Sequence, residues 1–167
     1  ISVNYMHMFN KQLKTEFLIA KSRFDIVLGF ATNASEGIVE EDFTQDVVLD
    51  LGRAFGTFIT RSGGSKVSIS GDIRLTTPKL KEWFSQGLIE TGITVLDLGI
   101  IPTPTNYYSM FHLDIDGAVQ ITGSHNPPEY NGFKISYKQQ AFYGEQIQSL
   151  KSLIETQDFE KSNNGKV

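Results

Sequence analysis

One segment of the sequence alternates between strand and helix signals, and it limits the possible folds more than any other. VSISG at residues 67–71 and ITVLDLG at residues 93–99 are both typical of strands, since each contains several β-branched residues. Between them, Pro78 and Gly92 mark the ends of a helix. The apolar residues of that helix fall on one face: Leu80, Trp83, Phe84, Gly87 and Leu88. A strand, a crossover helix and a strand at this spacing predict a βαβ unit with parallel strands.

Further helices and strands extend this unit in both directions. Apolar spacing predicts helices at residues 8–18 and 144–156, and another along Phe43, Val47, Leu51, Ala54 and Phe58. PTPT at 102–105 begins a short helix, whose Tyr107 and Tyr108 we expect in the core. Strands are predicted at 22–30, 117–122 and 132–137, and a loop at 31–41. The fold class is therefore α/β, a three-layer α/β/α sandwich with a small mixed, mostly parallel sheet.

Composition excludes several classes of partner. The chain has 15 Lys and Arg against 19 Asp and Glu, so its net charge of −4 does not favour nucleic acid. No apolar run approaches the roughly 20 residues of a membrane span, and we expect neither a membrane partner nor a signal peptide. The absence of cysteine excludes disulfides and thiolate metal sites, and fits a cytoplasmic protein.

The segment with the clearest chemistry is TGSHNPPEYNGFKI, residues 122–135. Ser124, His125 and Asn126 follow a strand, at the sheet edge where α/β proteins bind ligands. The two prolines after Asn126 stiffen the loop, and Lys134 could bring its ammonium group beside the serine. A serine in a rigid, cationic loop is a reasonable phosphate carrier or nucleophile. The alternative is a proline-rich turn in which the serine and histidine have no chemical role.

This segment resembles the phosphoserine loop of the α-D-phosphohexomutases, in particular the bacterial phosphomannomutase/phosphoglucomutase type. The resemblance continues through GDIRLTTPKLKEWFSQGLIETGITVLDLGIIPTPTNYY and GEQIQSLKSLIE. It implies an N-terminal extension at 1–21, the first phosphohexomutase domain at 22–160, and the start of an interdomain linker at 161–167. Members of this family have four domains, so domains II–IV of the same full-length chain are the implied partners.

The resemblance also implies a reaction and its residues. Ser124 matches the serine that passes a phosphoryl group to a hexose phosphate, giving a 1,6-bisphosphate intermediate whose other phosphate then returns to the serine. Lys134 and His125 are the further catalytic candidates, and Asn126 is a candidate for binding phosphate or substrate. The implied cofactor is Mg²⁺, held through the phosphate on Ser124 and by carboxylates of another domain, with glucose 1,6-bisphosphate as activator. We therefore expect the isolated domain to be inactive.

Two other segments of the chain contain acidic residues that could serve a site. Asp72 and Arg74 follow the 67–71 strand on the same side as Ser124, and we assign them to phosphate or substrate binding. For Asp72 a structural role, through hydrogen bonds to the serine loop, is favoured over a catalytic one. The first arginine of the family's Gly-Arg-Asp-x-Arg pattern is Gly71 here. Asp114 and Asp116 superficially resemble a metal loop, but they precede the serine strand and predict a turn.

The sequence departs from the family near its N-terminus. The family carries Tyr-Asp-Ile-Arg-Gly, whereas this chain has Phe24-Asp25-Ile26-Val27-Leu28-Gly29, without the arginine. The resemblance implies that this arginine contacts the active-site phosphate, and losing one such charge-assisted contact costs about 1.5–3 kcal/mol. This departure supports an alternative hypothesis, a non-catalytic relative that binds sugar phosphates or serves as an interaction domain.

Overall fold

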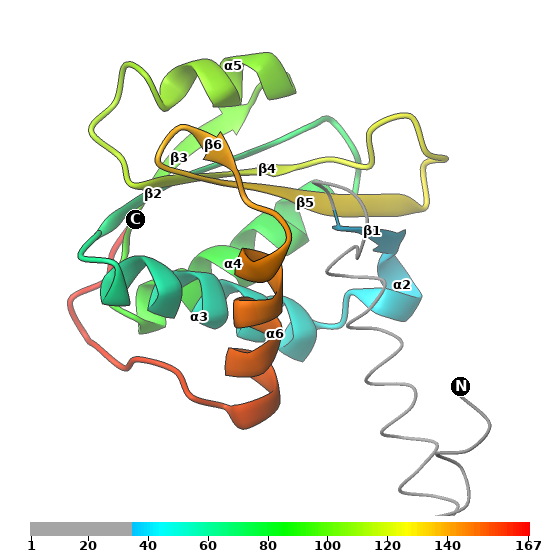
Figure 1. Ribbon diagram of the computed structural model, residues 1–167. Helices are drawn as coiled ribbons and strands as arrows, with labels where there is room; N and C mark the ends of the chain where they lie inside the picture. The colour runs from blue at the N-terminus through cyan, green and yellow to red at the C-terminus, as the bar shows by residue number, and fades with distance from the viewer. Residues whose placement is uncertain (1–34) are drawn as a thin grey trace, which may run out of the picture.

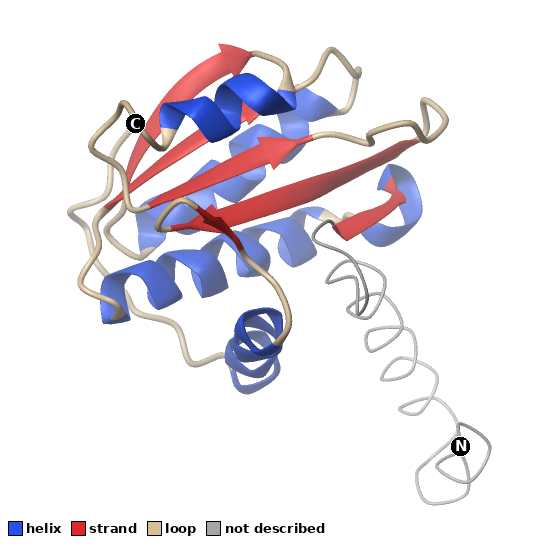
Figure 2. Ribbon diagram, turned by 45° about the horizontal axis from the view of Figure 1, so that its top comes forward, coloured by secondary structure: helices blue, strands red, loops and turns tan. Residues whose placement is uncertain are grey.

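A computed structural model describes residues 35–167, which form one six-stranded sheet with helices on both faces (Figures 1 and 2). Across the sheet the strands run β1 (Ser35–Ile38), β5 (Tyr130–Tyr137), β4 (Gly117–Ile121), β2 (Lys66–Gly71) and β3 (Thr94–Ile100), while β6 (Gln140–Ala141) pairs with β5. The predicted helix at 8–18, the predicted strand at 22–30 and the departure at Phe24–Gly29 lie outside the described residues.

The sheet is mixed, as predicted, but it is not mostly parallel. β2 pairs in parallel with β3 and β4, which confirms the βαβ unit. The β4–β5, β1–β5 and β5–β6 pairings are antiparallel. The connection at residues 122–129 explains the difference, because it is too short for a crossover helix and the chain doubles back as a hairpin.

Helices form the outer two layers. α3 (Gln45–Arg61), α4 (Thr77–Glu90) and α6 (Glu145–Thr156) cover one face, and the short α5 (Thr103–Ser109) lies on the other (Figure 1). Within residues 35–167 no helix has the length and apolar character that a membrane span requires. The core lies between the sheet and the three longer helices, and its largest buried rings are Phe43, Phe55, Phe84, Phe133 and Phe142. The three-layer prediction is confirmed.

α3 and α4 pack unusually closely because glycines face each other at their crossing. A Cβ atom on Gly52 would overlap the carbonyl oxygen of Phe84, and one on Gly87 would overlap that of Leu49. Interiors this dense tolerate added volume poorly. The contact therefore fixes the position of α4, whose first residue, Thr77, borders the site described below.

The tyrosines of α5 are not in the core, contrary to the prediction. Tyr107 and Tyr108 are 38% and 62% exposed. The sheet face beneath α5 is polar, and α5 binds it through an amide: Asn106 Nδ2 donates to Ser70 Oγ at 2.7 Å and to the Val119 carbonyl at 3.2 Å. The prediction of a core position was therefore wrong, because α5 packs on a polar part of the sheet.

The predicted loop at 31–41 was also wrong in part. Residues 35–38 form β1, which pairs with the free edge of β5, and they continue directly into α2 (Val39–Asp42). These elements have four residues each, too few to show a hydrophobic period. Backbone pairing with β5, rather than a local sequence signal, determines the strand.

Candidate functional site

The segment singled out from the sequence forms the loop between β4 and β5, at the right of Figure 1. It leaves β4 at the end where the parallel strands β2 and β3 also finish. Ser124 and His125 are exposed on this loop and Asn126 is half-buried. The structure therefore brings the predicted serine, histidine and amide to the carboxyl edge of the parallel strands, where α/β sheets bind ligands.

Ser124 has a backbone conformation that non-glycine residues seldom adopt. Its φ is 54°, in the left-handed region, and such a residue costs of order 1–3 kcal/mol. Its N–H donates to Thr122 Oγ1 at 3.0 Å, and the N–H of Asn126 closes a turn onto the Gly123 carbonyl at 2.9 Å. Ser124 Oγ lies 3.2 Å from Nδ1 of His125, a hydrogen bond in which either group can donate. Contacts around the loop must hold the serine in this shape.

Most of those contacts come from Arg74, whose side chain is only 14% exposed. Its Nη1 donates to the carbonyl oxygens of Pro127, at 2.6 Å, and Tyr130, at 3.0 Å. Its Nη2 donates to the carbonyl oxygens of Ser124, at 3.2 Å, and Asn126, at 2.9 Å. The guanidinium group thus lies against the loop and binds its backbone at four residues.

Asp72 holds the guanidinium group of Arg74 in place. One carboxylate oxygen accepts the Nε–H of Arg74 at 3.2 Å, and the other accepts the hydroxyl of Thr77 at 2.9 Å and the backbone N–H of Arg74 at 3.1 Å. The Thr122 hydroxyl also donates to this carboxylate. Burial raises the pKa of Asp72, but these hydrogen bonds and the Arg74 charge outweigh it, so the pKa lies below its usual value. The structural alternative for Asp72 fits these contacts better than phosphate binding.

The lowered pKa of Asp72 predicts a loss of stability in acid. A carboxyl group with a lower pKa in the folded state stabilises the fold above its unfolded pKa, about 3.9, and loses that contribution as the pH falls through the folded value. Urea unfolding should show wild type more stable than Asp72→Asn at pH 7, with the difference shrinking below about pH 4. A difference that stays constant down to pH 2 would contradict the assignment.

Lys134 lies on the face of the sheet that carries α5. It is directly opposite Gln120 in the β4–β5 pairing, so the two side chains share a face. Gln120 Oε1 accepts the Ser70 hydroxyl at 2.5 Å, and its Nε2 donates to the Ile101 carbonyl at 3.0 Å. Lys134 is half-buried and forms no ion pair with any residue in the part of the chain that the structure describes. Its ammonium group remains available to an anionic ligand.

Asn131 is a site residue that the sequence reasoning missed. It is fully buried, and its Nδ2 donates to the hydroxyls of Thr76, at 3.0 Å, and Thr77, at 3.1 Å. It thereby joins the end of the serine loop to the start of α4. The available signal was a polar residue at a position whose alternate neighbours in the strand, Phe133 and Ile135, are apolar. The partners of Asn131 could not be predicted, because they are distant in sequence.

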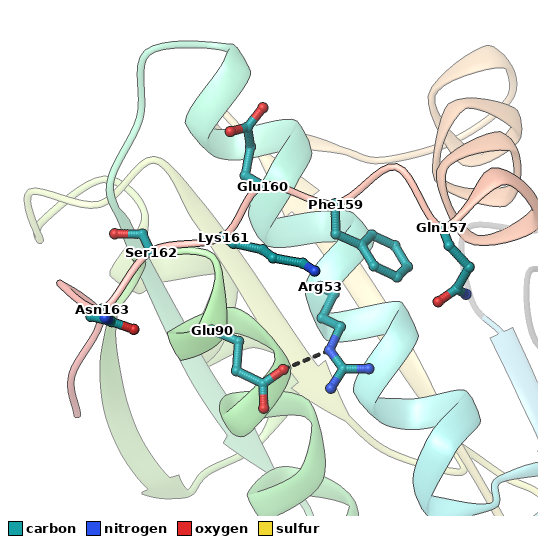
Figure 3. Close-up of a pocket in the computed structure, with 8 residues that line it drawn as sticks. All are labelled: Arg53, Glu90, Gln157, Phe159, Glu160, Lys161, Ser162 and Asn163. Atoms are coloured by element: carbon teal, nitrogen blue, oxygen red, sulfur yellow. Dashed lines mark hydrogen bonds and ion pairs between the residues drawn. The ribbon is translucent and has the colours of Figure 1, made fainter.

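Two other polar regions lie away from this loop. Asp116 accepts the backbone N–H groups of Ser65 and Lys66, at 2.7 and 3.0 Å, and Asp114 forms an ion pair with Lys66. Residues 114–116 belong to no helix or strand. A pocket of about 520 Å³ lies where the C-terminal segment crosses α3 and α4, and Arg53 and Glu90 form an ion pair in its wall (Figure 3). It adjoins the end of α4 that leads into β3, so it lies near the amino-terminal ends of the parallel strands, whereas Ser124 follows the carboxyl end of β4.

Comparison with known proteins adds to this geometry. Residues 28–161 match the family described as phosphoglucomutase/phosphomannomutase, alpha/beta/alpha domain I. The chain is 40% identical over 122 residues to a phosphomannomutase/phosphoglucomutase of Pseudomonas aeruginosa, covering 73% of this chain and 26% of that protein. A phosphoglucomutase/phosphomannomutase of Thermococcus kodakarensis is 42% identical over 108 residues, which cover 64% of this chain and 24% of the other.

A solved structure is similar as well. A phosphoglucomutase/phosphomannomutase family protein from Burkholderia thailandensis aligns with a TM-score of 0.76 and 36% identity, over 83% of this chain and 32% of that one. Fold and loop together define an α/β/α domain that presents a serine at the carboxyl edge of its parallel strands. The chain belongs to the phosphoglucomutase/phosphomannomutase family and corresponds to its domain I. It spans about a quarter of the length of the curated relatives it matches.

Proposed function

We propose that Ser124 carries the phosphoryl group in a reaction that interconverts hexose 1-phosphates and 6-phosphates, with mannose or glucose as the sugar. The observation that carries this proposal is an exposed serine hydroxyl in a loop held by Arg74, inside a domain whose relatives are named as mutases of these sugars. A phosphorylated Ser124 adds about −1.5 to −2 charges to the loop. Lys134, which forms no ion pair within residues 35–167, would supply a matching positive charge from β5. Phosphoryl transfer depends mainly on positioning and electrostatics, which these groups supply.

The proposed reaction consists of two balanced transfers. In the first, the bond between Ser124 Oγ and phosphorus breaks while the free hydroxyl oxygen of the sugar phosphate bonds to the phosphorus; the sugar hydroxyl loses its proton and Ser124 Oγ takes one up. In the second, Ser124 Oγ loses its proton and bonds to the phosphorus of the other phosphate, and the sugar oxygen that this phosphate leaves takes up a proton. The net result is an isomerisation. Lys134 would stabilise the transferring charge and help to move the proton at the sugar oxygen, while His125 would orient the Ser124 hydroxyl.

The described residues supply only part of such a site. In residues 35–167 no three His, Asp or Glu side chains lie where they could hold a metal ion, so the phosphate on Ser124 would be the domain's one contribution to a Mg²⁺ site. A bound Mg²⁺ would neutralise charge on the phosphoryl oxygens. Its other ligands, like the groups that bind the distal phosphate, would come from domains II–IV of a full-length chain. The isolated domain is therefore expected to be inactive.

The proposal also covers the arrangement of the chain. Residues 1–21 would be an extension, 22–160 the domain itself, and 161–167 the start of a linker. In the structure Lys166 lies beside β3. The N–H of Lys166 donates to the Ile93 carbonyl at 3.3 Å, and the Lys166 carbonyl accepts the N–H of Val95 at 2.7 Å. A cytoplasmic location is part of the proposal, and the cysteine-free composition fits such a reducing compartment.

The test is covalent labelling of the full-length protein. Incubation with glucose 1,6-bisphosphate and Mg²⁺ should transfer one phosphoryl group to the protein, and peptide mass spectrometry should place it on Ser124. The Ser124→Ala variant should remain unlabelled. Label on another residue, or none on the wild type, would contradict the proposal. Sugar-phosphate binding without label would favour the non-catalytic alternative that the missing arginine at Phe24–Gly29 suggests.

A further inference from the structure

We infer that Arg74 is a positioning residue that holds the serine loop in its reactive shape, rather than a ligand of the phosphosugar. The inference rests on the proposed function of Ser124 and adds a role for a residue that touches neither the phosphoryl group nor the sugar. It also replaces the prediction that Arg74 binds phosphate or substrate.

The number of donors on Arg74 is the first argument. A guanidinium group has five N–H donors in a fixed, planar arrangement. Its Nε donates to Asp72, and each terminal nitrogen donates to two backbone carbonyl oxygens of the loop. All five donors are therefore used within the protein. A phosphate group could bind Arg74 only by displacing a contact that the loop already makes.

The sequence of the loop is the second argument. The carbonyl oxygens of Asn126 and Pro127 each belong to a peptide bond with a following proline, which has no N–H. The loop therefore has few donors of its own, and these carbonyl groups must find partners elsewhere. Arg74 is the partner that the structure provides.

The conformation of Ser124 is the third argument. Its left-handed backbone persists only where the surroundings impose it. Arg74 binds the carbonyl oxygen of Ser124 and also those of three later residues of the loop, Asn126, Pro127 and Tyr130. Without the guanidinium group, the serine can relax to an ordinary φ and its hydroxyl will leave the position in which it reacts.

Loss of positioning predicts a particular kinetic result. A misplacement of about 1 Å at a reacting group costs about 10²-fold in rate. Arg74→Lys keeps the charge but replaces the planar fork with three donors at one point. In the full-length protein we expect kcat to fall about 30- to 100-fold while KM for the hexose phosphate changes by less than about threefold, because substrate binding does not use this side chain.

The experiment compares Arg74→Lys with Arg61→Lys. Arg61 pairs with Asp158 and Glu160 on the surface, so its variant makes the same chemical change away from the loop. Each full-length variant is assayed for kcat and KM, for the rate of phosphoryl transfer to Ser124 from glucose 1,6-bisphosphate, and for amide exchange in residues 122–131. Only Arg74→Lys should show slower transfer and faster exchange of the Ser124 and Asn126 amides, whose hydrogen bonds lie within the loop.

The outcomes separate the inference from the proposed function. A raised KM with unchanged exchange would make Arg74 a substrate ligand and overturn the inference, as would unchanged kcat and exchange. Absence of label on wild-type Ser124 would overturn the proposed function, while amide exchange would still test the contact between Arg74 and the loop. If Arg74→Lys does not fold, Asp72→Asn provides the second variant: it weakens the support of Arg74, and kcat and exchange should change in the same directions by a smaller factor.

Discussion

Replacing Ser124 with alanine should reduce the mutase turnover of the full-length protein by about 10³-fold or more, because it removes the only atom to which the phosphoryl group can be attached in the proposed reaction. The effect should appear in kcat with either glucose 1-phosphate or mannose 1-phosphate, measured as formation of the 6-phosphate. Added bisphosphate should not restore activity, since the variant has no oxygen to accept its phosphoryl group.

A second substitution at the same position controls for folding. Glycine adopts the left-handed conformation of Ser124 without strain, whereas alanine does not. Ser124→Gly should therefore be as inactive as Ser124→Ala but about 1 kcal/mol more stable to urea. Turnover within tenfold of wild type in both variants would contradict the assignment of Ser124 as the phosphoryl carrier.

Replacing Lys134 with glutamine should lower kcat by roughly 10²- to 10⁴-fold, the usual contribution of a positioned proton-transfer group. Lys134 is half-buried, and within residues 35–167 no carboxylate pairs with it, so its charge is available to a phosphoryl group brought to that face. Glutamine removes the charge but keeps a polar side chain that is one atom shorter than lysine. Labelling of Ser124 should become slower but should still reach one phosphoryl group per chain.

Lys138 provides the matched control for this experiment. It follows β5, and its ammonium group lies 5.1 Å from the ring centre of Tyr137, away from the strand position opposite Gln120. Lys138→Gln should leave kcat within about twofold of wild type, since exposed substitutions seldom matter at a distance. Equal losses in Lys138→Gln and Lys134→Gln would show that general charge, rather than the position of Lys134, supports the reaction.

The sequence predicted the helices and strands in which apolar residues recur at a regular spacing. The apolar stripe of Leu80, Phe84 and Leu88 identified α4 because each of these residues is buried against the sheet. The helix begins at Thr77, one residue before Pro78, and the Thr77 hydroxyl donates to Asp72. β1 could not be predicted, because pairing with β5 determines it.

Part of the site could be predicted in the same way. Ser124, His125 and Asn126 were identified by their loop, and Asp72 and Arg74 by their place at the end of a parallel strand. The role of Arg74 was not predictable, because it depends on carbonyl groups about fifty residues further along the chain. The partners of this arginine in the loop are all backbone carbonyl groups. Every residue has such a group, so the residue types of the loop do not indicate the contact.

The contact of Lys166 with β3 has a consequence for handling the protein. β3 is the last strand on its side of the sheet, and hydrogen bonds through Lys166 cover part of its exposed edge. Uncovered edges recruit strands from other molecules and promote aggregation. A version of the domain cut after Phe159 would lose this cover, so soluble expression calls for keeping Lys166.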